Sequence, residues 1–114
     1  MINRVIITGR LTATPELTKS ENGTSATRFR IANNRDEKTA DFYTVRAFNH
    51  NADFVTKYGR KGAEIAIDGK LRTFTNADGK TYTFILADNI QLFRDRKGEP
   101  GQQTEPAESE ELPW

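Results

Sequence analysis

Three phenylalanines and three cations are spaced so that they share one face of a β-sheet. They are Phe42, Arg46 and Phe48 in one segment, and Lys70, Arg72 and Phe74 in another. Side chains at alternate positions of a strand point to the same side. An aromatic ring stacks on an unpaired base of any sequence, which is worth about 1–3 kcal/mol per base, while cations follow the phosphates. The pattern therefore favours a surface for single-stranded nucleic acid over one for a duplex, whose bases are already stacked.

The phenylalanines have two other interpretations. A register shifted by one residue would place them in the core, and an interface with another subunit would also cover them. A single aromatic residue is more often simply buried. Three aromatic residues in phase with three cations on two strands favour the nucleic-acid surface.

More cations surround these segments, and solvation alone accounts for roughly half of them. Arg28, Arg30 and Arg35 are the strongest candidates for binding phosphates, because they run from a predicted strand into a loop that can fold over a bound strand. We also include Arg4 among the expected nucleic-acid contacts. His50 is the one histidine of the chain, and we interpret it as a surface or phosphate-facing residue.

The sequence offers little for catalysis. It has no cysteine and a single histidine, which excludes thiolate chemistry and makes a zinc site improbable. Asp36, Glu37 and Asp41 lie close enough in sequence to suggest a metal-dependent nuclease. A polar loop is the better interpretation, because nothing supplies a positioned base or a second set of metal ligands. We expect neither an enzyme nor a cofactor.

A change of composition at residue 98 marks a tail. Residues 98–114 contain five acids and no base, and they lack the apolar surface needed to fold. We therefore expect a nucleic-acid-binding domain at 1–97 and a disordered acidic tail at 98–114. The tail ends in Glu110, Glu111, Leu112, Pro113 and Trp114. A tryptophan there adds nothing to folding, so this tip predicts docking into a basic-rimmed apolar pocket of a protein partner.

Charge is divided unevenly between these two parts. Residues 1–97 carry all 17 Lys and Arg but only 11 of the 16 Asp and Glu, although the 114-residue chain has a net charge of +1. A basic body is typical of nucleic-acid-binding proteins. No apolar run reaches about 18 residues, and the first residues lack the features of a signal peptide. We expect a cytoplasmic protein that contacts no membrane.

The elements that must position the candidate residues are mostly strands. Alternating apolar and polar residues predict strands at 4–11, 25–33, 41–48, 64–75 and 81–93, and a capped helix at 51–58. Asn76 to Gly79 is typical of a hairpin turn, and Gly69 permits a bend. Alternation assigns Tyr43 and Leu71 to the core. Five strands with a helix between the third and fourth predict an all-β fold, the five-stranded oligonucleotide-binding barrel.

Several segments of the chain resemble the bacterial single-stranded DNA-binding protein family. They are NRVIITGRL at 3–11 followed by PEL at 15–17, YGRKG at 58–62, IDGKLRT at 67–73, and EELPW at 110–114. The resemblance covers residues 1 to about 95 and the last five, although the family's tip ordinarily ends in Pro-Phe.

The resemblance implies a homotetramer of barrels, with a homodimer as the other possibility, that wraps unpaired DNA without sequence preference. It implies that the tip recruits enzymes of DNA replication, recombination and repair. Phe42, Phe48 and Phe74 match the family's aromatic positions, and His50 and Lys61 fall at positions that are basic in the family.

The chain departs from the family at residues 34–40, a short loop without the family's usual aromatic residue. One stacking platform is therefore missing. Two alternatives stay open on the residues alone: an oligonucleotide-binding barrel for single-stranded RNA, and an interaction adaptor whose aromatic face binds protein.

Overall fold

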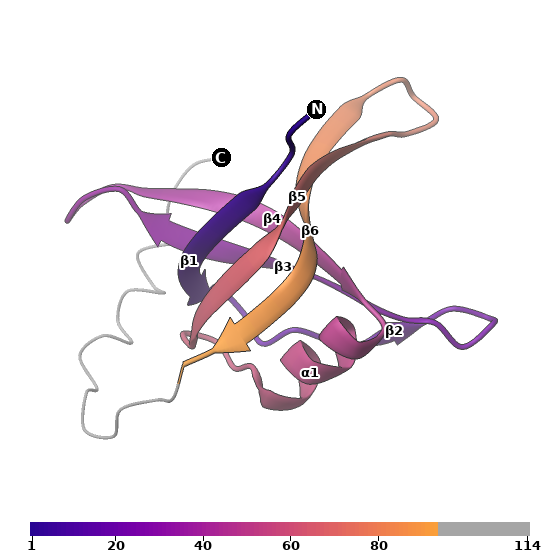
Figure 1. Cartoon of the computed structure of the whole chain (residues 1–114), viewed down its shortest axis with the longest axis horizontal. Helices are drawn as coiled ribbons and strands as arrows, with labels where there is room; N and C mark the ends of the chain where they lie inside the picture. The colour runs from indigo at the N-terminus through magenta and orange to yellow at the C-terminus, as the bar shows by residue number, and fades with distance from the viewer. Residues whose placement is uncertain (94–114) are drawn as a thin grey trace.

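The computed structural model describes residues 1–93. Within them, one sheet curls into a barrel with a single helix at one end (Figure 1). The elements are β1 (Val5–Leu11), β2 (Thr18–Lys19), β3 (Ser25–Asn34), β4 (Ala40–Phe48), α1 (His50–Tyr58), β5 (Glu64–Thr75) and β6 (Thr81–Leu92). The predictions for the tail and its tip lie outside the described residues.

The strands close into the predicted oligonucleotide-binding barrel. Hydrogen-bonded neighbours follow the order β1-β5-β6-β4-β3-β2, and β1 also pairs with β3. The pairing of β4 with β6 is parallel, and the other pairings are antiparallel. Gly9 permits the closure, because a Cβ there would lie 2.7 Å from the carbonyl oxygen of Ala32 on β3. The two-residue strand β2 was not predicted.

Apolar side chains from the long strands and α1 fill the barrel. The largest fully buried ones are Leu11, Ile31, Ile65, Ile67, Val45 and Val55. Tyr43 and Leu71 correct the predicted core, because their side chains are 38% and 47% exposed. Leu71 lies beyond Gly69, where the pairing of β1 with β5 ends, and Tyr43 precedes the first pair between β4 and β6. The alternating pattern of apolar and polar residues continues past the part of each strand that belongs to the closed barrel.

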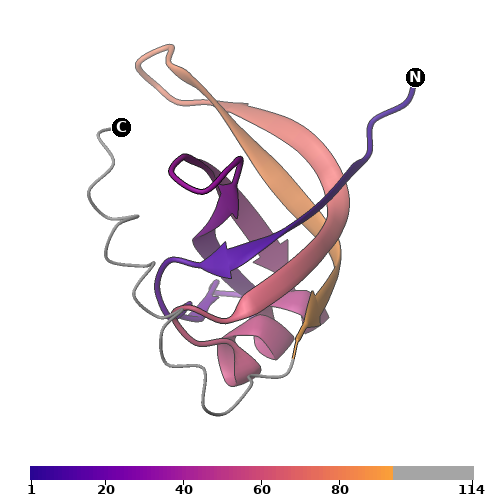
Figure 2. The same ribbon diagram turned by 90° about the vertical axis from the view of Figure 1, so that its left-hand side faces the viewer.

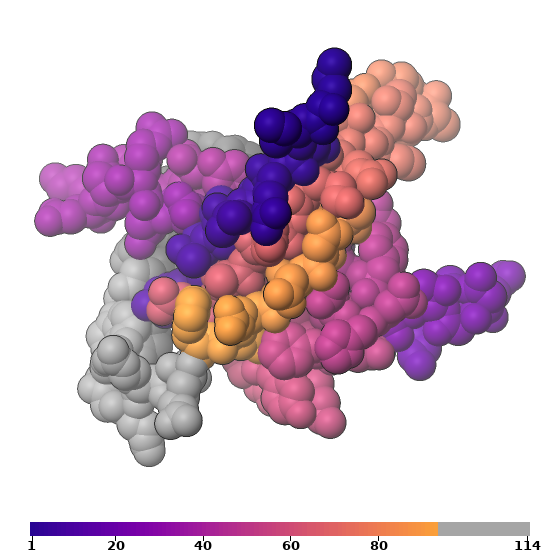
Figure 3. All heavy atoms as spheres, in the orientation of Figure 1, coloured from indigo at the N-terminus to yellow at the C-terminus, as the bar shows by residue number. Residues whose placement is uncertain are grey.

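Strands β5 and β6 continue beyond the barrel as a hairpin (Figures 2 and 3). Its turn is the predicted one: the amide of Asn76 donates to the carbonyl of Lys80 at 2.9 Å, and Gly79 has a φ of +85°. The register shifts between Asp68 and Gly69, where a Cβ on Gly69 would collide with the carbonyl oxygen of Leu86. Glycine at this position thus lets the hairpin bend, as predicted.

Helix α1 begins one residue earlier than predicted. The capped start predicted at residue 51 is wrong, because Asn51 lies inside the helix and the preceding Asn49, with a φ of +56°, makes no side-chain capping hydrogen bond. The helix ends as expected at Gly59, whose amide donates to the carbonyl of Val55 at 2.8 Å. In the described part of the chain, no helix has the length and apolar character needed to cross a membrane.

Candidate nucleic-acid interface

The outward face of β3 and β4 carries two arginines directly opposite each other. Arg28 on β3 is the ladder partner of Arg46 on β4, and Arg46 in turn lies beside Leu86 on β6. Residues directly opposite in a ladder share a face, and like charges in such a pair destabilise the sheet. Within residues 1–93, neither arginine forms an ion pair with an acid. Two uncompensated cations held side by side are a natural site for a polyanion.

The β5–β6 hairpin adds aromatic rings to the same side. Phe74 on β5 is the ladder partner of Tyr82 on β6, and their side chains are 53% and 49% exposed. Arg72 is likewise opposite Phe84. Because the hairpin leaves the barrel, these rings are not needed to fill the core. They are available to stack on a ligand.

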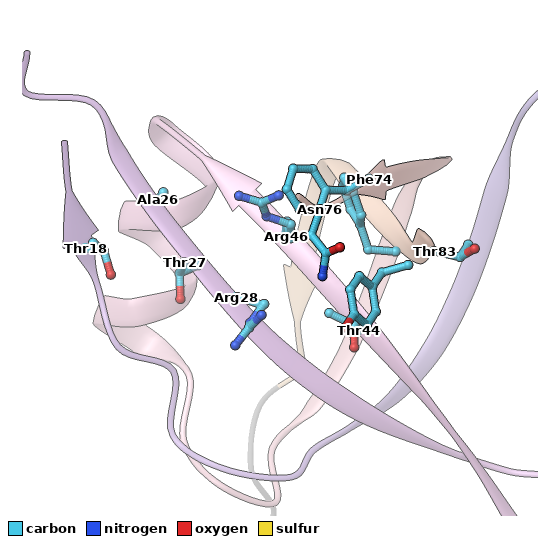
Figure 4. Close-up of a pocket in the computed structure, with 11 residues that line it drawn as sticks. Thr18, Ala26, Thr27, Arg28, Thr44, Arg46, Phe74, Asn76 and Thr83 are labelled. Carbon is cyan, nitrogen blue, oxygen red and sulfur yellow. The ribbon is translucent and has the colours of Figure 1, made fainter. Parts of the chain in front are cut away.

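Together these elements enclose an open pocket of about 750 Å³ (Figure 4). Strands β3 and β4 form one side and the hairpin forms the other. The lining residues are Thr18, Ala26, Thr27, Arg28, Thr44, Arg46, Phe74, Asn76, Tyr82, Thr83 and Phe84. None of them is acidic, so the lining combines aromatic rings and hydroxyl groups with two positive charges.

Arg46 is held between two aromatic rings. Its guanidinium carbon lies 5.4 Å from the ring centroid of Phe48 and 5.1 Å from that of Phe84. Both distances are within the range of a cation–π interaction. A guanidinium oriented in this way loses less rotamer entropy when its N–H groups bind a phosphate.

The comparisons with known proteins agree with this geometry. Residues 2–93 match the model of the single-strand binding protein family. This chain belongs to that family. It is 42% identical over 105 residues to "Single-stranded DNA-binding protein 2" of Streptococcus agalactiae, covering 84% of this chain and 80% of the relative. It is 35% identical over 113 residues to "Single-stranded DNA-binding protein 1" of Staphylococcus aureus, covering 90% and 72%.

The structure brings only part of the predicted interface of this family member to the pocket. Arg28, Arg46 and Phe74 line it, and Phe48 lies against Arg46. Phe42 is half-buried further along β4, with the guanidinium of Arg30 over its ring at 5.8 Å. Burial lowers the pKa of the Arg30 guanidinium below its usual value. Arg72 is exposed on β5 but does not line the pocket.

Three other predicted cations are engaged with acids. Arg4 pairs with Asp68 at 2.9 Å, Arg35 pairs with Asp41 at 2.6 Å, and Lys70 lies 3.7 Å from Asp88. The hydrogen bond to Asp41 and the charge of that carboxylate raise the pKa of Arg35. These cations have a structural partner before any ligand arrives.

His50 and Lys61 lie outside the pocket, at the two ends of the helical segment. His50 is the first residue of α1, and its ring lies 6.5 Å from the ring of Phe54. The backbone amide of Lys61, beyond the helix, donates to the Thr14 hydroxyl at 3.1 Å. Both side chains are exposed.

Tyr82, Phe84 and Asn76 are pocket residues that the sequence analysis did not select. A signal for the two aromatic residues was present, because they alternate along β6 just as Phe42 and Phe48 do along β4. Asn76 was identified only as a turn residue. Among residues 1–93, no group of His, Asp and Glu side chains is placed to hold a metal ion.

Proposed function

We propose that this chain binds single-stranded DNA through the pocket between β3–β4 and the hairpin, without reading a particular sequence. One observation carries the proposal: in a member of the single-strand binding protein family, Phe74, Tyr82 and Phe84 face Arg28 and Arg46, and no acid lines the pocket. Rings stack on bases of any kind, and cations neutralise phosphates. The two relatives described above bear names that state single-stranded DNA binding.

Fluorescence anisotropy of a labelled oligo-dT, measured beside a duplex of equal length over a salt series, tests the proposal. We expect tight binding of the single strand, little binding of the duplex, and a log–log salt slope of about −0.7 per phosphate contacted. Equal binding of both, vanishing with salt, would show a non-specific polycation instead. Weak binding of both would favour a protein-interaction adaptor, and tighter binding of a matched oligo-rU would favour RNA.

We propose that the remaining predicted residues contact the DNA outside the pocket. Phe42 and Phe48 lie on the path of the DNA strand along β4. The DNA phosphates are contacted by Arg30, Arg72, Lys70, His50 and Lys61. Arg4, Arg35 and Lys70 are the weakest members of the set, because each already pairs with a carboxylate. Alanine variants tested by anisotropy should therefore separate the pocket residues from these three.

We also propose that the chain assembles with copies of itself, as a homotetramer or a homodimer. Exposed apolar side chains support self-association: Ile6 on β1 is 72% exposed, and Leu71 and Tyr43 are the two that leave the predicted core. Large exposed apolar residues on a small domain are typical of interaction surfaces. Sedimentation equilibrium should give a single multimeric mass, and a monomer at micromolar concentration would contradict assembly.

We further propose that the chain protects unpaired DNA during replication, recombination and repair, and that Glu110 to Trp114 recruits partner enzymes. Trp114 is the one tryptophan of the sequence, so its emission reports on docking of the tip. Adding a purified repair or replication protein with a basic-rimmed apolar pocket should shift that emission to shorter wavelength. An unchanged spectrum with every such partner would refute the docking role.

A further inference from the structure

Asn76 opens the hairpin turn and also lines the pocket. Its Oδ1 accepts hydrogen bonds from the backbone amides of Asp78 at 2.9 Å and Lys80 at 3.0 Å. Because both partners are N–H donors, the side-chain atom of Asn76 that faces them must be the acceptor Oδ1, and this fixes the orientation of the side-chain amide. Its Nδ2 has no hydrogen-bond partner within residues 1–93 and points into the pocket in Figure 4.

The polar lining of the pocket is therefore biased toward donors. Arg28 and Arg46 carry only N–H donors, and the free group of Asn76 is also a donor. The threonine and tyrosine hydroxyls can donate or accept, but no carboxylate is present to act only as an acceptor. The Thr27 hydroxyl already donates to the carbonyl of Glu16 at 2.8 Å.

Bases differ in what they offer to such a lining. Thymine and uracil carry a carbonyl oxygen at position 4 and guanine carries one at position 6, whereas cytosine and adenine carry an amine at the corresponding position. Cytosine and uracil have rings of the same size. Position 4 bears an amine in cytosine and a carbonyl in uracil, and ring nitrogen 3 is an acceptor in cytosine and an N–H donor in uracil. An amine that leaves water and faces only donors makes no hydrogen bond, and an unsatisfied donor of this kind costs binding free energy.

We propose that Asn76 is a specificity-determining residue, which makes the pocket prefer bases with a carbonyl at position 4 of a pyrimidine or position 6 of a purine over bases with an amine there. The inference rests on the function proposed above and deepens it. The preference distinguishes classes of base, since thymine and guanine both satisfy it, so it does not amount to reading a sequence.

Competition between oligo-dU and oligo-dC of equal length, at slightly alkaline pH, measures the preference on the full chain. The two strands have the same charge and the same stacking area per ring, so their ratio of Kd isolates the hydrogen-bonding edge. One net hydrogen bond predicts that dU binds about three- to tenfold more tightly. A ratio of one would overturn the inference while leaving single-strand binding intact, whereas failure to bind either strand would refute the proposed function itself.

The variant Asn76→Asp tests the residue directly. Aspartate keeps the Oδ1 acceptor that holds the turn but replaces the Nδ2 donor by an acceptor. Its added charge weakens binding of both strands alike and cancels in the ratio of their Kd values. Replacement of the donor by an acceptor should bring that ratio to one or reverse it in favour of dC. Ala77→Asp is the matched control, because it adds the same charge at the exposed neighbouring residue and should leave the ratio unchanged. An unchanged ratio in Asn76→Asp would refute the role of Asn76.

Discussion

The arginines near the two ends of strand β4 have different neighbours: one is paired with a carboxylate and the other lies against aromatic rings. Near the start of β4, Arg35 forms an ion pair with Asp41. The Asp36 carboxylate accepts hydrogen bonds from the backbone amides of Lys38 and Thr39 at 2.8 Å each. This group of residues is satisfied within the chain and organises the loop at 35–39. Near the other end, Arg46 lies between two rings without an acidic partner in the described residues, directly opposite Arg28.

The charge of an arginine therefore does not by itself mark a ligand site. A cation within reach of a carboxylate has its charge compensated, and a phosphate must compete for it. A cation supported by aromatic rings keeps its N–H groups for a ligand. Variants at the Arg46 end and at the Arg35 end of β4 test this contrast.

Among the variants, loss of Arg46 should weaken DNA binding most. Arg46→Ala should weaken oligo-dT binding by about 1.5–3 kcal/mol, the usual worth of a hydrogen bond to a charged group. The salt slope should become less steep by about 0.7 for each phosphate released. Arg35→Ala is the matched comparison, and it should change affinity by less than about twofold because the screened charge is distant from the pocket. Equal losses of oligo-dT affinity in Arg46→Ala and Arg35→Ala would show that the two arginines contribute alike to binding.

Loss of one stacking ring should rank next. Phe74 is half exposed on the hairpin, so Phe74→Ala leaves the core intact. We expect binding to weaken by about 1–3 kcal/mol with oligonucleotides of every sequence, because stacking is tolerant of sequence. Phe93→Ala serves as the control: that side chain is 43% exposed but does not line the pocket. A loss confined to one base would contradict a general stacking role.

A smaller effect should follow loss of the ring beneath Arg46. Phe84→Leu keeps an apolar side chain but removes the cation–π contact at 5.1 Å. Binding should weaken by roughly 0.5–1 kcal/mol, as expected for one such contact. In a double-mutant cycle with Arg46→Ala, the two effects should be less than additive. Strict additivity would mean that Phe84 does not act through Arg46.

The smallest effect concerns folding at the Arg35 end. Hydrogen bonds from the backbone amides of Lys38 and Thr39 lower the pKa of Asp36 below its ordinary value of 3.8. A carboxyl with a lowered pKa in the folded state adds stability above its unfolded pKa, and that stability is lost as the pH falls through the folded pKa. The Tm difference between the native chain and Asp36→Ala should therefore shrink below about pH 4. A difference that is constant with pH would exclude this contribution.

The sequence was sufficient where a local pattern decides the structure. Alternation predicted the long strands, and the Asn76 to Gly79 turn followed from residue types that tolerate its backbone angles. It could not show where β4 and β5 leave the barrel, which is why Tyr43 and Leu71 were wrongly assigned to the core. The two residues of β2 are too few to show a period.

The site was predicted less completely because it depends on register across strands. Of the predicted nucleic-acid contacts, Arg28, Arg46 and Phe74 line the pocket, since each lies on the alternating outward face of its own strand. The pairing of Arg4 with Asp68 joins residues 64 positions apart, so it follows only from the alignment of β1 with β5. Contact with DNA stays a prediction for every one of the selected residues, those that line the pocket included.

Stacking of bases in the pocket is best tested by titrating oligo-dT and an abasic strand of the same length and charge into the full chain at one salt concentration. If base stacking in the pocket drives binding, the abasic strand should bind at least about tenfold more weakly. Equal affinity for the two strands would show that the basic surface alone accounts for binding, and would contradict the aromatic pocket as the site of single-strand recognition.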